Sequence, residues 1–193
     1  LLLLLSAALA AADDVTLDLQ SVVVATFDDP NEMQWIVQGS KFATKDFPLA
    51  QPVRAWPDSL FGRNPKNQNT LLALGVHSRF DRKGYNYIEV IPAKKGSDGK
   101  LAPAPIVLPG RVRMIDMWVW GANYNYTLDV HMRDFQGVDR VLHAGSMMFA
   151  GWKNMSVVVT GNIPQSRRYL PQFQPLELTK IVIWTHPTEK VDD

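Results

Sequence analysis

The fold class is indicated most clearly by residues 126–134, which read YTLDVHMRD. The apolar side chains occupy every second position: Leu128, Val130 and Met132. The polar side chains occupy the positions between them: Asp129, His131 and Arg133. Because successive side chains of a strand point to opposite faces, this alternation predicts a strand with one face in a core and one face in water.

A neighbouring stretch, residues 112–121, carries apolar side chains on both faces. One row is Ile115, Met117 and Val119, and the other is Asp116, Trp118 and Trp120. Bulk on both faces is typical of a strand in the middle of a sheet, so we expect a central strand here with one aromatic-rich face.

The rest of the chain also favours strands, because it has no heptads, repeats or long amphipathic helix. Further strands are expected at residues 22–27, from residue 34, and at 70–80, 85–91, 140–144, 153–160 and 178–186. We expect 70–80 and 85–91 to pair through the turn at 81–84, and residues 48–69, rich in Pro and Asn, to form a long loop. This pattern predicts an all-β, two-sheet antiparallel sandwich, similar to a jelly roll or a carbohydrate-binding module.

Composition limits both the size and the partners of this fold. With 193 residues and 46% hydrophobic content, we expect one domain, at residues 13–193. The formal net charge of +1 provides no overall field to attract nucleic acid or an anionic membrane. The chain has no cysteine, which removes thiol catalysis and cysteine-ligated zinc from consideration.

Residues 1–12 resemble the apolar part of a secretory signal. Five leucines are followed by small residues up to Ala12, and Asp13 and Asp14 come directly after. A membrane-spanning helix needs about 20 apolar residues, so this segment predicts a cleaved leader and no membrane anchor. An exported protein without cysteine fits a bacterial periplasm.

No pattern typical of an enzyme occurs in the sequence. The nucleophile elbow, the zinc-binding helix motif and the phosphate-binding loop are all missing. The four histidines lack the spacing of metal ligands: His77, His131, His143 and His186. We therefore expect a protein that is not an enzyme and uses no cofactor or metal.

Several short runs together carry a family resemblance. They are WVWGA (118–122), VHMRD (130–134), GWKNM (151–155), VATFD (24–28) and SKFAT (40–44). In these runs the chain resembles the flagellar filament outer layer (FlaA) proteins of spirochaetes. The resemblance implies a periplasmic sheath protein whose partners are flagellin core subunits and other sheath proteins.

A second function stays open from the residues themselves. Carbohydrate-binding modules stack sugars on aromatic side chains, and Trp118 with Trp120 offers such a platform. Polar partners on a neighbouring strand would be Asp129, His131 and Arg133. The alternative for the two indoles is burial, because indoles are highly buried on average.

Basic side chains gather in the expected loops and are candidate protein contacts. Arginine is enriched at interface cores and lysine is depleted. Three arginines are therefore of most interest: Arg63, Arg79 and Arg167.

Overall fold

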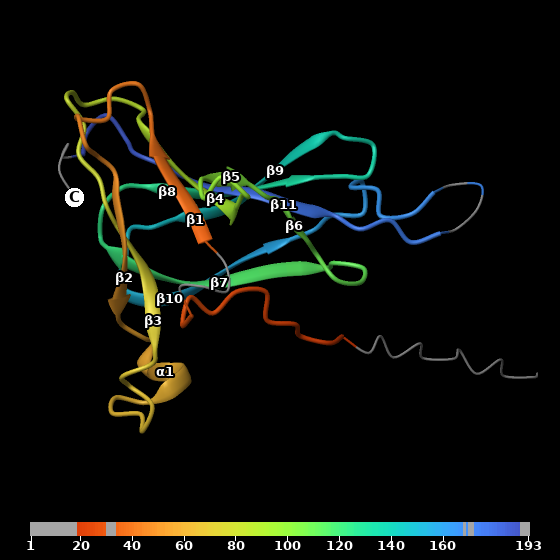
Figure 1. The fold of residues 1–193 in the computed structure, drawn as a ribbon, viewed down its shortest axis with the longest axis horizontal. Helices are drawn as coiled ribbons and strands as arrows, with labels where there is room; N and C mark the ends of the chain where they lie inside the picture. Colours follow the sequence, from red (N-terminus) through yellow and green to blue (C-terminus); the bar gives the residue numbers. More distant parts are fainter. Residues whose placement is uncertain (1–18, 30–33, 168, 170–171, 190–193) are drawn as a thin grey trace, which may run out of the picture.

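The computed structural model describes residues 19–29, 34–167, 169 and 172–189. The expected leader at residues 1–12 lies outside this part of the chain. The described residues form eleven strands and one four-residue helix (Figure 1). In chain order the elements are β1 (Gln34–Gly39), β2 (Leu49–Arg54), α1 (Asp58–Phe61), β3 (Leu72–His77), β4 (Tyr87–Lys95), β5 (Leu101–Pro103), β6 (Ile106–Val107), β7 (Met114–Ala122), β8 (Thr127–Arg133), β9 (Asp139–Ser146), β10 (Ala150–Val158) and β11 (Glu177–Trp184).

One layer of the molecule is a large antiparallel sheet. Its strands follow the order β1-β4-β11-β8-β9, and the short strands β5 and β6 pair with β4 and β11. Most neighbours in this sheet are far apart in the chain, since β4 pairs with both β1 and β11. The sheet is therefore held together mainly by long-range pairing.

The opposite layer consists of two separate two-stranded ribbons. One ribbon is β7 with β10, and the other is β2 with β3, both antiparallel. Figure 1 shows β7 and β10 running across one side of the strands β8, β9 and β11. The fold is thus the expected antiparallel sandwich, with its second layer divided in two.

The main core lies between the large sheet and the β7–β10 ribbon. Its buried members are Leu108, Leu128, Val130, Met132, Met155, Val157, Val159, Ile163, Leu176 and Leu178. Ile115, Met117 and Val119 pack against them from β7. The prediction that Leu128, Val130 and Met132 face a core is therefore confirmed. For β7 the structure now shows that Ile115, Met117 and Val119 form the inward row.

A smaller core lies beneath β3. Phe80, Ile88 and Val90 are its buried members, and Leu74 and Val76 of β3 pack against them. This packing explains why β2–β3 forms a ribbon across the end of the sheet that contains β1 and β4. Pairing of 70–80 with 85–91 is wrong, since β3 pairs with β2 while β4 pairs with β1 and β11.

The prediction of a long loop at residues 48–69 is wrong in part. The segment contains β2 and α1, and Pro52 lies within β2. Proline has no backbone N–H to donate to a neighbouring strand, so within sheets it occurs on edge strands. β2 is such a strand, because it pairs with β3 alone among the described strands.

Two other predictions about strands also fail. Residues 22–27 form no strand, although three consecutive valines favour one. β7 is not central, because within the described part of the chain it pairs with β10 alone. The row Asp116, Trp118 and Trp120 lies on the side of β7 opposite Ile115, Met117 and Val119, which pack on the main core.

Candidate interaction surfaces

The outward side of the β7–β10 ribbon carries a group of aromatic side chains. Because Ile115, Met117 and Val119 point into the core, the alternate residues of β7 point away from it. Trp118 and Trp120 lie on this side, joined by Trp152 of β10. We call Trp118, Trp120 and Trp152 the tryptophan face.

The pairing register fixes the arrangement of the tryptophan face. Trp120 lies opposite Trp152, with ring centroids 5.8 Å apart in an edge-to-face arrangement. Trp118 lies opposite Asn154, whose side-chain amide donates a 2.6 Å hydrogen bond to Asp116. Trp120 is 59% exposed. The face therefore combines the exposed indole of Trp120, held by the partly buried Trp152, with a polar group one pair further along the ribbon.

Gly121 and Phe149 approach each other closely on the inward side of the ribbon, behind the tryptophan face. Gly121 lies on the inward side of β7, and a Cβ there would meet Phe149 ring atoms at 2.7 Å and its carbonyl oxygen still closer. Only a residue without a side chain fits. Gly121 thereby allows Phe149 to pack against the main core.

The outward side of the large sheet is polar, and Asp129 lies near its centre. The carboxylate accepts a 3.0 Å hydrogen bond from the indole N–H of Trp184, and its other oxygen lies 2.7 Å from Nδ1 of His143. Trp184 also meets Tyr87 edge to face. These contacts hold Asp129 in one orientation among side chains from β4, β8, β9 and β11.

A second polar group lies beside it on the same side of the sheet. Glu89 accepts hydrogen bonds from Lys180 at 2.5 Å and from Gln38 at 2.6 Å. Burial alone would raise the pKa of Glu89, but these two hydrogen bonds outweigh it and hold the pKa below its ordinary value. Glu89 is therefore a fixed anion paired with Lys180.

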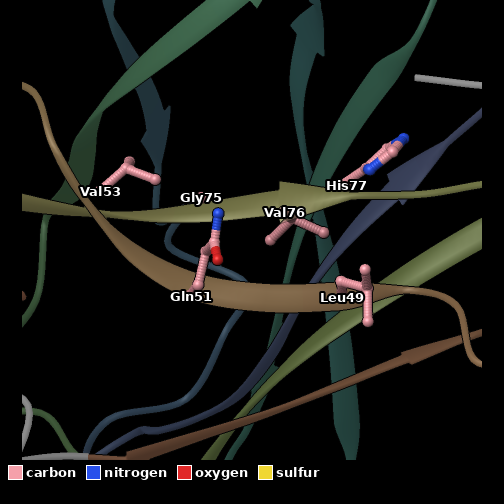
Figure 2. A pocket seen from close by; sticks show the side chains of 6 residues that line it. All are labelled: Leu49, Gln51, Val53, Gly75, Val76 and His77. Carbon is pink, nitrogen blue, oxygen red and sulfur yellow. The ribbon is translucent and has the colours of Figure 1, made fainter.

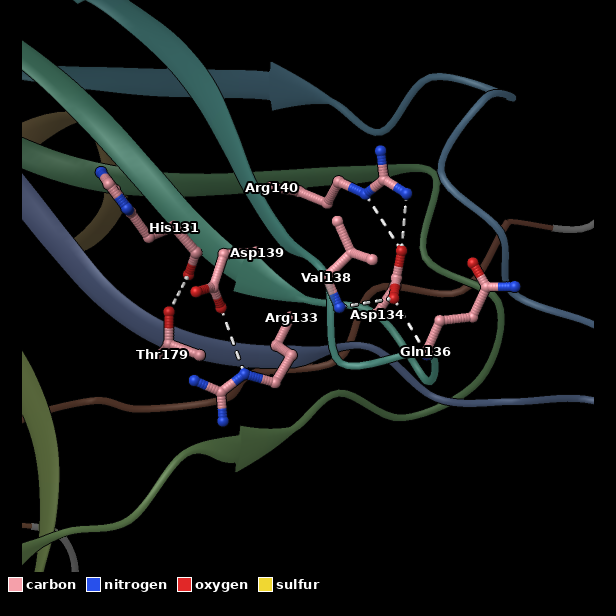
Figure 3. Close-up of polar contacts among 8 residues, drawn as sticks. All are labelled: His131, Arg133, Asp134, Gln136, Val138, Asp139, Arg140 and Thr179. Carbon is pink, nitrogen blue, oxygen red and sulfur yellow. Dashed lines mark hydrogen bonds and ion pairs between the residues drawn. The ribbon is translucent and has the colours of Figure 1, made fainter.

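His131 stands next to this pair, opposite Lys180 in the register. Burial lowers the pKa of His131, and the positive charge of Lys180 lowers it further. Its Nε2 is buried and finds no hydrogen-bond partner among the described residues. His131 is therefore uncharged at neutral pH. Its backbone oxygen accepts a 3.1 Å hydrogen bond from Thr179, at the bulge of β11 (Figure 3).

The turn between β8 and β9 is organised by a buried carboxylate (Figure 3). Asp134 has a side chain with no exposed surface and accepts two hydrogen bonds from Arg140, at 2.8 and 3.0 Å. The backbone N–H groups of Gln136 and Val138 also donate to it. Burial would raise its pKa, but these donors outweigh burial and lower it. Arg133 points to the other side and pairs with exposed Asp139 at 3.1 Å.

The two predicted rows do not lie next to each other. β7 and β8 belong to different layers, and their inward side chains meet in the same core. Trp118 and Trp120 therefore point away from one side of the sandwich, and Asp129, His131 and Arg133 point away from the other. The expectation that the polar row lies on a strand beside the tryptophans is wrong, because the chain passes from one layer to the other between β7 and β8.

The three candidate arginines do not form one patch. Arg63 follows α1, Arg79 lies between β3 and β4, and Arg167 lies between β10 and β11; all three are exposed. Figure 1 places the α1 segment and the β10–β11 connection at different ends of the molecule. Any contacts made through Arg63 and Arg167 therefore involve different surfaces.

A shallow hollow lies on the β2–β3 ribbon (Figure 2). Its lining residues are Leu49, Gln51, Val53, Gly75, Val76 and His77. A Cβ at Gly75 would lie 2.7 Å from a methyl carbon of Val53, so glycine is what lets Val53 lie across the ribbon. His77 is the titratable member of this lining, and its ring meets Phe47 edge to face with centroids 5.1 Å apart.

The described residues offer neither a cluster of metal ligands nor a membrane-spanning helix. No group of three or more histidine, aspartate or glutamate side chains in the described ranges could hold a metal ion. No helix in the same ranges is long and apolar enough to cross a bilayer.

Reasoning from sequence missed the partners of several candidate residues. Trp152 was part of a family motif but was not recognised as the partner of Trp120. Glu89, Lys180 and Trp184 were also missed, because each lies about 40 residues or more from the side chain on β8 that it approaches. The alternation of β4 and β11 was the available signal, since it identifies which side chains point outward.

Comparison with known proteins shows which family the chain belongs to. A model of the flagellar filament outer layer protein FlaA matches residues 18–193. The chain belongs to this family. The resemblance seen in the tryptophan-rich motifs is thereby confirmed, and the family consists of structural components of the flagellar filament.

A curated relative agrees with this assignment. It is a flagellar filament outer layer-like protein of Brachyspira hyodysenteriae (strain ATCC 49526 / WA1), 29% identical over 98 residues. The match covers 51% of this chain and 41% of that protein, so the chain spans about two fifths of the length of this relative. Among solved structures, a CBM61 module in complex with β-1,4-galactotriose matches with a TM-score of 0.38 and 15% identity, over 79% of each chain.

Proposed function

We propose that the chain is a structural subunit of the outer layer of a periplasmic flagellar filament, where it coats the flagellin core and contacts other sheath proteins. The observation that carries the proposal is the family match over residues 18–193. No catalytic step is part of this role.

The tryptophan face is the surface we assign to protein contact. Tryptophan residues are enriched among the side chains that dominate binding energy at interfaces. Trp120 is exposed yet supported on one side by Trp152, so little conformational freedom is lost when a partner covers it. Asp116 and Asn154 supply polar groups at the border of the same surface.

In this proposal the coat changes the curvature and the stiffness of the filament. A layer of folded subunits bonded to a helical core adds its own preferred subunit spacing. Where that spacing differs from the spacing of the core, the two layers settle on a compromise curvature and the filament becomes stiffer. We therefore expect the protein to influence filament shape, stiffness and motility.

Location and loss of the protein test the proposal together. Antibody labelling is expected on intact filaments and is expected to disappear from filaments stripped to their core. Cells lacking the protein are expected to build filaments that are thinner or differently curved and to swim less well. Labelling confined to other compartments, with unchanged filament diameter and shape in the deletion strain, would contradict the proposed role.

A second candidate function is glycan binding at the tryptophan face. The observation in its favour is the exposed Trp120, paired with Trp152 and close to the Asp116–Asn154 hydrogen bond, which combines stacking surface with polar groups. A glycan screen separates the two candidates. Binding that is lost in Trp120→Ala favours the glycan, and binding only to flagellar core subunits favours the coat.

A further inference from the structure

A strand-like segment of the chain has no strand partner among the described residues. Residues 19–26 read LQSVVVAT and carry no charge. We call them the exposed arm. Val23 is 76% exposed, and Leu19 and Val22 are also largely exposed. Three consecutive β-branched residues favour an extended backbone that pairs with a sheet edge, so their exposure needs a physical reason.

The backbone of the exposed arm has no partner within the described part of the chain. Residues 19–25 make no hydrogen bond to another described residue, and Thr26 accepts one only from the nearby N–H of Asp28. The domain holds the next residues firmly. Phe27 packs on Trp35 with ring centroids 5.3 Å apart, and Asp28 accepts a 2.8 Å hydrogen bond from the N–H of Leu72. The exposed arm therefore leaves the domain from a fixed point.

The domain also has a sheet edge with little protection. β7 is nine residues long, has one charged residue, Asp116, and pairs with β10 alone among the described strands. Natural edge strands are usually protected by lysine, proline, bulges or short length. The side-chain amide of Gln165 covers the start of this edge, because it bonds both the N–H and the carbonyl of Val112. This protection stops before β7 begins.

The other edges are less suited to accept a strand. β10 is equally long but carries Lys153 and a positive backbone φ of 90° at Gly151. β9 carries charges at Asp139 and Arg140 and a φ of 115° at Gly145. β1, β2 and β3 are six residues each. β7 thus offers the longest edge with the fewest obstacles.

We propose that the exposed arm of one copy adds as a strand to the free edge of β7 in a neighbouring copy. Eight extended residues reach about 26 Å, close to the length of a nine-residue strand. Main-chain hydrogen bonds would supply the affinity, as in other cases of strand addition. The arm and the β7 edge are different surfaces, so the contact is head-to-tail. Unless two copies exchange arms reciprocally or a ring closes, one arm and one edge stay open at the ends of each assembly.

This geometry extends beyond a dimer. A head-to-tail contact that does not close into a ring continues into a row of subunits. The inference concerns contacts between copies, and it does not depend on whether the partner beneath the coat is flagellin. Its failure would leave the proposed coat role standing, with subunits held by the core alone.

Engineered cysteines test the contact, because the natural chain has no cysteine to interfere. One copy carries Val23→Cys with an affinity tag, and untagged copies carry cysteine at Met114, Asp116 or Trp118 in turn. Mild oxidation of the mixture is expected to link tagged to untagged chains at one or more of these positions. Val141→Cys, on β9 and similarly exposed, serves as the control and is expected to give no link.

Other linkage patterns would overturn the proposal. A link to Val141 would place the arm on a different edge. A doubly substituted chain, Val23→Cys with Asp116→Cys, that links only within itself at high dilution and at high concentration alike would show that the arm closes on its own β7. Absence of any link between Val23→Cys and the three β7 positions would also contradict the proposal.

Self-association gives an independent measurement that needs no cross-link. Proline removes the backbone N–H, so Val22→Pro or Val23→Pro is expected to weaken self-association in sedimentation by about tenfold or more. Val23→Thr keeps the N–H and the β-branched shape and is expected to associate like the unsubstituted protein. Equal association of all these variants would contradict strand addition.

Discussion

Trp120 of β7 lies directly opposite Trp152 of β10, and their rings meet edge to face with centroids 5.8 Å apart. The contact joins two strands whose inward side chains form one side of the main core. Trp120 is thus fixed by a neighbour while most of its surface stays exposed. An aromatic side chain that is held in place and uncovered is suited to bind a partner at little entropic cost.

The first prediction separates binding from folding at this position. Trp120→Asp is expected to lower the free energy of unfolding by about 1 kcal/mol, because it removes one aromatic pair at an exposed site. It is expected to reduce assembly on filament cores strongly, since an unpaired charge would be buried at the contact. Co-sedimentation with stripped filaments measures the second effect.

Val141→Asp provides the matched control for that experiment. Val141 lies on β9, on the other side of the sandwich, and is 56% exposed. It should co-sediment like the unsubstituted protein. If both aspartate variants lose binding equally, the tryptophan face has no special role.

The second prediction concerns the close approach at Gly121. Gly121→Ala is expected to lower the free energy of unfolding by about 1–3 kcal/mol, because the new methyl group meets the ring and backbone of Phe149 and the core is overpacked. Gly161→Ala is the control, since nothing lies within 4 Å of a Cβ at that position. Urea denaturation of the two variants tests the difference; equal midpoints would show that Phe149 can move aside freely.

The third prediction concerns acid and the buried Asp134. Its carboxyl has a lower pKa in the folded state than in the unfolded chain, so ionisation stabilises the fold above the ordinary value of 3.8. That stabilisation is lost as the pH falls from about this value through the lower folded pKa. Asp134→Asn is expected to cost about 1.5–3 kcal/mol at neutral pH, because Arg140 loses its charged partner.

The free energy of unfolding, measured as a function of pH for both proteins, tests this prediction. The unsubstituted protein is expected to lose more stability than Asp134→Asn between pH 5 and the acid limit of folding. His131 acts in the same direction at higher pH, since its lowered pKa means that its protonation opposes folding. Parallel pH profiles for the two proteins would show that Asp134 contributes no proton-linked stability.

The sequence predicts local geometry here better than it predicts partners. The alternation of Leu128, Val130 and Met132 assigned the faces of β8 correctly, because burial of every second residue leaves a direct trace in the chain. Pairing leaves no such trace. β8 joins β11, about 50 residues away, and β4 joins β1 and β11 rather than β3. Such pairings depend on which layers can close around one core.

The candidate site shows the same limit. Trp118 and Trp120 were identified correctly as one row of β7, and this row does face outward. The prediction that Asp129 and its neighbours accompany them failed, because it assumed that strands following each other in the chain lie side by side. Trp152 was missed since only the register of β7 with β10 brings it opposite Trp120.

The last prediction concerns Arg133, which remains a candidate protein contact. Arg133 is 45% exposed and pairs with Asp139 at 3.1 Å. An exposed ion pair contributes at most about 1 kcal/mol, so Arg133→Glu should change the melting temperature little even though it sets like charges together. Arg140→Glu is the contrast, because Arg140 neutralises the buried Asp134. That variant should be strongly destabilised.

Assembly then decides the role of the polar side of the sandwich. If Arg133 contacts a neighbouring filament protein, Arg133→Glu should fold normally but enter the coat poorly, since a like-charge contact at an interface costs several kcal/mol. Quantifying incorporation of Arg133→Glu beside the unsubstituted protein in the same cells measures this effect. Normal incorporation with normal stability would mean that this side faces water, and a large loss of stability would mean that the Arg133–Asp139 pair supports the β8–β9 turn.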